Sequence, residues 1–89
     1  MLKIKFVTNT SEKMTVSIAP QDYQAVGYQL VNNGPAFVRD SKSGITLMLQ
    51  GDLMGDMLFV EYDGEFVAAR RGGRLTLGKK LLLLSKGVS

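Results

Sequence analysis

Residues 2–8 read Leu-Lys-Ile-Lys-Phe-Val-Thr, and in this stretch apolar side chains alternate with lysines. A period of two is typical of a β-strand that buries one of its faces. After the polar segment 9–13, residues 14–19 repeat the alternation, with methionine, valine and isoleucine on one face. The two stretches together predict an N-terminal β-hairpin.

The segment after this hairpin is expected to be helical. Pro20 ends the second strand, because proline cannot donate to a sheet ladder and is well tolerated in the first turn of a helix. Apolar residues at helical spacing then predict a helix over 21–32, with Asn-Asn-Gly-Pro at 32–35 as its stop. Gly27 costs the helix about 1 kcal/mol relative to alanine. Apolar residues at 26, 28 and 30 also alternate, so a strand is the alternative.

From residue 36 onward, short apolar runs alternate with turn residues, which predicts a series of strands. The expected strands cover residues 36–40, 45–50, 57–62, 65–70, 74–77 and 81–85. Asp63-Gly64 is a strong signal for a two-residue hairpin turn, because both residues tolerate positive φ. Further turns are expected at 41–44, at Gly72-Gly73 and at Gly78. Residues 51–56 are expected to form a loop or a single helical turn.

These elements predict a mainly β (α+β) fold, a small antiparallel sheet or barrel with one short helix near residues 21–32. A length of 89 residues predicts one domain, residues 1–89. Apolar residues at 45% and charged residues at 21% are near globular averages and argue against disorder. The expected core consists of Leu2, Ile4, Phe6, Met14, Val16, Ile18, Phe37, Val38, Leu47, Leu49, Leu58, Val60, Val67 and Leu82.

The sequence contains no cysteine and no histidine, which excludes most site chemistry. Disulfides, thiolate nucleophiles, zinc ribbons and iron–sulfur clusters need cysteine, and Ser-His or Cys-His relays need histidine. Only hard cations such as Ca²⁺ or Mg²⁺ keep suitable ligands. We therefore expect no catalytic residue, no metal site and no cofactor, with a carboxylate- or lysine-dependent enzyme as the least favoured class of function.

Two local patterns resemble functional motifs and fail on inspection. Residues 73–80 match the GxxxxGK pattern of a phosphate-binding loop, but Lys80 stands where a magnesium-binding Ser or Thr is needed, and the nine residues after it are expected to be too few for the long helix that such a loop precedes. Acidic residues gather between Asp52 and Glu65, but without the spacing of an EF-hand. We interpret the first pattern as a basic hairpin and the acidic residues as turn and surface residues.

The N-terminus alternates apolar and charged residues, whereas a signal peptide needs an uninterrupted apolar core. The longest leucine run, 81–84, is far shorter than the ~20 apolar residues that span a bilayer. The sequence therefore predicts a cytoplasmic protein with no membrane partner.

Charge is unevenly distributed along the chain. Residues 1–65 contain five basic and eight acidic residues, a formal charge of −3, whereas residues 66–89 contain six basic residues and no acid, +6. A basic face attracts phosphates and acidic proteins. The predicted patch lies across two adjacent strands joined by a turn at Gly78 and consists of Arg70, Arg71, Arg74, Lys79 and Lys80.

These observations favour a non-enzymatic module for protein binding or assembly, which acts through sheet edges or a charged face. Its partner is another protein or a second copy, and opposite charges with unpaired edges favour a homo-oligomer. The alternative is a small β domain that binds nucleic acid through the basic C-terminal segment. Tyr62 and Phe66 flank a turn and are candidates for stacking on bases, but a core or cross-strand role is favoured for them.

Overall fold

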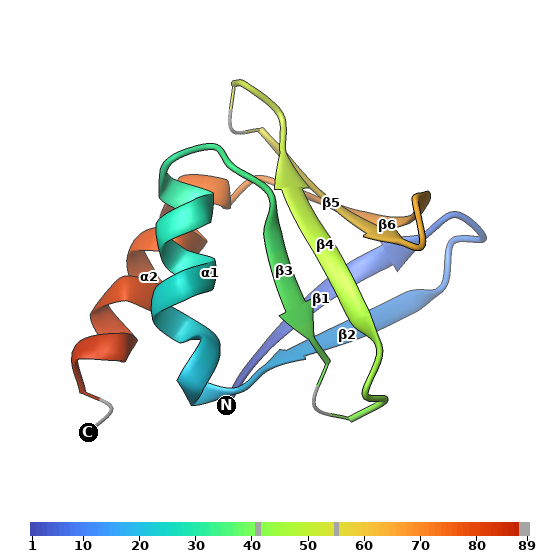
Figure 1. The fold of residues 1–89 in the computed structure, drawn as a ribbon. Helices are drawn as coiled ribbons and strands as arrows, with labels where there is room; N and C mark the ends of the chain where they lie inside the picture. The colour runs from blue at the N-terminus through green and yellow to red at the C-terminus, as the bar shows by residue number, and fades with distance from the viewer. Residues whose placement is uncertain (41, 55, 88–89) are drawn as a thin grey trace.

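The computed structural model describes residues 1–40, 42–54 and 56–87, which form a curled six-stranded antiparallel sheet with two helices on one side (Figure 1). The mainly β (α+β) prediction is confirmed. The elements are β1 (Leu2–Thr8), β2 (Lys13–Ile18), the 3₁₀ turn η1 (Pro20–Asp22), α1 (Tyr23–Val31), β3 (Ala36–Arg39), β4 (Thr46–Gly51), β5 (Met57–Tyr62), β6 (Glu65–Arg71) and α2 (Arg74–Lys86). Ser41 of the predicted 41–44 turn and Gly55 of segment 51–56 lie outside the described residues.

The sheet has the strand order β2-β1-β6-β5-β4-β3, so β2 and β3 are its two outer strands. β3 to β6 form a meander of successive antiparallel strands. β6 then pairs with β1 over only two positions, Val7 with Ala69 and Thr8 with Ala68. The β1–β2 hairpin therefore diverges from the meander, and in Figure 1 it crosses behind β3 and β4. The divergence leaves the inner face of the sheet open to the helices.

The core lies between this inner face and the helices. The alternation of apolar residues along the strands predicts such a buried face. Nine of the expected core residues are buried, namely Ile4, Phe6, Val16, Ile18, Val38, Leu47, Leu49, Leu58 and Val60. Leu2, Met14, Val67 and Leu82 are partly buried. The expectation is wrong for Phe37, which is 66% exposed, because its neighbours Ala36 and Val38 occupy the inner face of β3. The helices add buried Tyr23, Val26, Leu30, Leu77 and Leu81.

The predicted helix over 21–32 is confirmed, with the turn η1 followed by α1, and the strand alternative is wrong. The expected strands at 74–77 and 81–85 are also wrong, because these residues belong to α2. Its buried residues, Arg74, Leu77, Gly78 and Leu81, have the spacing i, i+3, i+4 and i+7 of a helix face. Leucine, lysine and arginine are also good helix formers, and Thr76 is the only β-branched residue of the helix.

Gly78 is a packing residue and not a turn. A Cβ atom added at Gly78 would lie 3.1 Å from the carbonyl oxygen of Gly27, and one added at Gly27 would lie 2.9 Å from the carbonyl oxygen of Gly78. Two helices can approach this closely only where both lack side chains. The glycine pair therefore lets α2 lie directly against α1, which in turn lies beside β3 (Figure 1).

Candidate functional site

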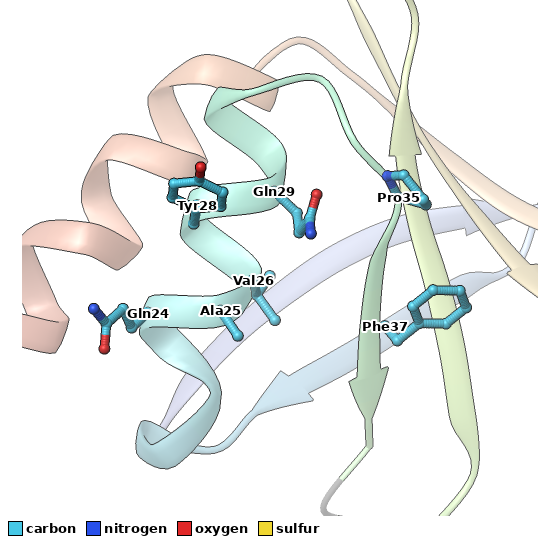
Figure 2. Close-up of a pocket in the computed structure, with 7 residues that line it drawn as sticks. All are labelled: Gln24, Ala25, Val26, Tyr28, Gln29, Pro35 and Phe37. Atoms are coloured by element: carbon cyan, nitrogen blue, oxygen red, sulfur yellow. The ribbon is translucent and has the colours of Figure 1, made fainter.

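A groove lies between α1 and β3 (Figure 2). Its volume is about 480 Å³, and its walls are mostly apolar. On one side the groove is lined by Pro35, which precedes β3, and by Phe37 on β3. On the other side it is lined by five residues of α1, namely Gln24, Ala25, Val26, Tyr28 and Gln29. The phenyl ring of Phe37 and the phenol of Tyr28 are both more than half exposed. The groove therefore offers apolar surface that the fold itself does not cover.

β3 borders this groove with an unpaired strand edge. The amide of Asp40 donates to the carbonyl oxygen of Ile45 at 2.8 Å, which shows that this amide faces β4. Backbone groups of a strand alternate in direction, so those of Ala36 and Val38 also face β4. The N–H and C=O groups of Phe37 and Arg39 point away from β4, and no strand of the described residues pairs with them.

A second hollow lies at the other end of the same strand. It has a volume of about 400 Å³ and is lined by Ala19, Gln21, Asp22, Arg39, Asp40 and Gly44. Phe37 lines the first hollow and Arg39 the second, two positions apart on the outer face of β3. The two hollows therefore lie at the two ends of β3.

The unpaired edge of β2, the other outer strand, is capped at Ser17 by the side chain of Asp40, which follows β3. The amide of Ser17, which points away from β1, donates to Oδ1 of Asp40 at 2.9 Å. Oδ2 of the same carboxylate accepts hydrogen bonds from the amide of Ser43 at 3.1 Å and from its hydroxyl at 2.8 Å. Asp40 is only 7% exposed. Its carboxylate therefore occupies the edge position that a neighbouring strand would otherwise fill.

The pKa of Asp40 reflects this environment. Burial raises the pKa, but the hydrogen bonds from Ser17 and Ser43, with the positive charge of Lys42, together hold it below the ordinary value for aspartate. The carboxylate is therefore ionised at neutral pH, and its oxygens are committed to hydrogen bonds within the protein.

The charges beside the groove are few. The sequence of α1, Tyr-Gln-Ala-Val-Gly-Tyr-Gln-Leu-Val, contains no charged residue. Arg39 is exposed and makes no ion pair with any of the residues that the structure describes. A ligand in the groove would meet amide and apolar groups along α1 and a free guanidinium at the end of β3.

The structure does not place the predicted basic patch on two strands. Arg70 and Arg71 lie at the end of β6, and the other three residues belong to α2. Arg70 and Lys80 line one small hollow of about 200 Å³, together with Gly73, Thr76 and Leu77. Arg71 and Lys79 are exposed and do not line that hollow.

Arg74 is a buried residue. Only 6% of its surface is exposed, and its Nη1 donates to the carbonyl oxygen of Leu30 at the end of α1. Its Nε has no hydrogen-bond partner within the described part of the chain. The side chain lies against Gly51, where an added Cβ would clash with the arginine Cδ. Arg74 therefore ties the end of α1 to the end of β4.

The acidic and aromatic residues that the sequence singled out serve turns and strand pairs. Asp52 accepts hydrogen bonds from the amides of Asp56 and Met57, and Asp63 has a φ of 54°, as the predicted hairpin turn requires. Phe66 makes an edge-to-face contact with Phe59, with ring centroids 5.9 Å apart. Within residues 1–40, 42–54 and 56–87, no three acidic side chains form a metal-binding group. No helix in the same ranges is long and apolar enough to cross a membrane.

Comparison of this chain with protein-family models, curated proteins and solved structures finds no match. The candidate site therefore rests on geometry. Sequence reasoning missed the groove because it assigned both Phe37 and Val38 to the core. A strict period of two over 36–39 would have placed Phe37 on the outer face and indicated an exposed aromatic ring on an outer strand.

Proposed function

We propose that this protein is a non-enzymatic binding module that holds an extended segment of a partner protein along β3. The observation that carries the proposal is the unpaired edge of β3 directly beside a groove with mostly apolar walls. An extended segment that adds to a sheet edge gains affinity from backbone hydrogen bonds and specificity from pockets for alternate side chains. β3 offers both features within four residues.

The backbone groups of Phe37 and Arg39 would form the ladder with the bound segment. Each contributes one N–H donor and one C=O acceptor, and each hydrogen bond contributes about 0.5–1.5 kcal/mol net. Alternate side chains of the segment would point toward α1, where exposed Ala25 supplies apolar contact. Gln24 and Gln29 supply amide groups that can bond to polar atoms of the ligand.

The nucleic-acid alternative has weaker support. It needs several cations on one surface, but Arg74 is buried, and the hollow that Arg70 and Lys80 line includes neither Arg71 nor Lys79. It stays a prediction, which elution from a heparin column over a salt gradient would test.

A titration followed by nuclear magnetic resonance tests the proposal. The ¹⁵N-labelled protein is titrated with acetyl-Ser-Val-Phe-Val-Ser-amide, a palindromic probe whose phenylalanine can lie opposite Phe37 in either chain direction. We expect amide shifts at Phe37, Arg39 and Ala25 and none at Thr15 on β2. Absence of shifts on β3, or equal shifts on β2, would overturn the proposal. Shifts that grow with protein concentration alone would assign the edge to a second copy instead of a partner segment.

N-methylation of the probe and a filled groove provide the controls. Methylation of the probe amides that point toward β3 removes ladder hydrogen bonds and should weaken binding. Methylation of the alternate amides, which point away from β3, should leave binding unchanged. The exposed Ala25→Trp variant is expected to block the groove and abolish the shifts without lowering the melting temperature. Its matched control, Thr15→Trp on the β2 edge, is expected to bind the probe normally.

A further inference from the structure

We infer that the segment bound along β3 is acidic, with a carboxylate side chain two positions from an apolar residue that lies opposite Phe37. This inference rests on the proposed function and names the chemistry of the ligand. It follows from the order of side chains on the outer face of β3 and from the charges available at its end.

The spacing comes from the register of an added strand. Phe37 and Arg39 occupy alternate positions and are both exposed, so their side chains lie on the same outer face. Residues directly opposite them on a bound strand would also be two positions apart on that face. Cross-strand pairs of this kind favour an aromatic or apolar partner for phenylalanine and an opposite charge for arginine.

The residue between these two would face the inner side of the sheet. Its partner position on β3 is Val38, which is fully buried. A side chain there would point toward the groove wall at Ala25, where a branched aliphatic group fits apolar surroundings. The ligand pattern is therefore an apolar residue, an aliphatic residue and an acidic residue, in this order or its reverse.

Charge complementarity supports the acidic position. Arg39 and Lys42 are exposed cations at this end of β3. Asp40 forms no ion pair with Arg39, and its oxygens accept hydrogen bonds from Ser17 and Ser43. Asp22, which lines the same hollow, is half-buried and forms no ion pair with Arg39. Glu61 on β5 and Asp63 after it line a further hollow with Phe37, but β4 separates them from β3. The charge directly opposite a ligand residue at position 39 is therefore that of Arg39.

Two charged probes test the inference against the neutral one. Acetyl-Glu-Val-Phe-Val-Glu-amide and acetyl-Lys-Val-Phe-Val-Lys-amide are titrated in the same way and in low salt. We expect the glutamate probe to bind about threefold more tightly than the serine probe and the lysine probe to bind more weakly, as for an exposed charge pair. Arg39→Glu is expected to reverse this order.

Lys5→Glu is the matched control, because it changes the net charge by the same amount on β1, away from the groove. It is expected to keep the order of the three probes, and if it reverses that order as Arg39→Glu does, the preference belongs to net charge and the inference is overturned. Equal affinity of all three probes for the wild type would also overturn it and leave the proposed function intact. Failure of every probe to shift β3 would remove the proposed function itself.

Discussion

The two outer strands of the sheet differ in how their unpaired edges are treated. On β2, the outward amide of Ser17 donates to the buried carboxylate of Asp40. On β3, no strand within the described part of the chain lies beside the outward backbone groups of Phe37 and Arg39, and hollows lie at both ends of the strand. Unpaired edges invite association with other chains, and proteins usually protect them. The β2 edge is therefore protected at Ser17, whereas among the described residues no hydrogen bond caps the outward groups of Phe37 and Arg39.

The same residue connects the two edges. Asp40 directly follows β3, yet its side chain reaches across the open side of the curled sheet to β2. This contact fixes the end of β3 relative to the N-terminal hairpin. The contact with β2 therefore contributes to the rigidity of β3, and a rigid strand loses less conformational entropy on binding.

The largest expected effect concerns the helix pair that supports the open edge. In Gly78→Leu the new side chain has no room, because even a Cβ atom would lie 2.8 Å from Cγ2 of Val31 and 3.1 Å from the Gly27 carbonyl. We expect a loss of about 3 kcal/mol of unfolding free energy, despite the better helix propensity of leucine. The melting temperature should fall by more than about 10 °C.

Gly87→Ala is the control for this substitution. Gly87 is exposed, and the nearest atom to an added Cβ is the Leu84 carbonyl oxygen at 3.7 Å. We expect its stability to change by less than about 0.5 kcal/mol. Similar stability of the Gly78→Leu variant and the wild type would show that α1 and α2 do not pack through the glycine pair.

The next effect compares the two edges directly. Asp40→Ala leaves the buried amide of Ser17 without an acceptor, and a buried unsatisfied donor costs about 1–3 kcal/mol. Arg39→Ala, at the neighbouring position on the open edge, removes an exposed side chain and should cost less than about 0.5 kcal/mol. Urea unfolding measures both values. Equal losses in the two variants would contradict the distinction between a closed and an open edge.

A smaller effect appears as a dependence of stability on pH. The pKa of Asp40 is lower in the folded protein than in the unfolded chain, so its ionised form stabilises the fold above the unfolded pKa of about 3.9. This contribution is lost as the pH falls from there through the folded pKa. Thermal unfolding between pH 6 and 2 should show the loss, and Asp40→Asn should reduce it. An unchanged pH profile in Asp40→Asn would show that other carboxylates cause the acid sensitivity.

The sequence predicted the parts of the fold that depend on local periodicity. The alternation over 2–8 and 14–19 and the Asp63-Gly64 turn were sufficient for two hairpins, because their signals are contained within a few neighbouring residues. The helix over 21–32 was predicted from its apolar spacing. In each case the exposed and buried faces carry clearly different side chains.

The failures arose where burial did not follow residue type. Arg74 is buried and Phe37 is exposed. A prediction based on polarity alone exposes Arg74 and buries Phe37. Gly78 has the composition of a turn, but its lack of a side chain serves helix packing against Gly27. The predicted basic patch depended on the strands that α2 replaced. The groove could not be predicted because its two walls, α1 and β3, meet only in three dimensions.

The smallest expected effect leaves stability unchanged and is seen in amide hydrogen exchange. In the wild type, the amide of Ser17 should exchange slowly, because it donates to Asp40, whereas Thr15 on the same edge should exchange fast. On β3, Val38 should be protected by β4, and Phe37 and Arg39 should exchange fast because their amides face away from it. The glutamate probe should slow exchange at Phe37 and Arg39 and leave Thr15 fast. Protection of Phe37 and Arg39 without any probe would mean that the β3 edge is already paired, and the proposal of an available edge would then be wrong.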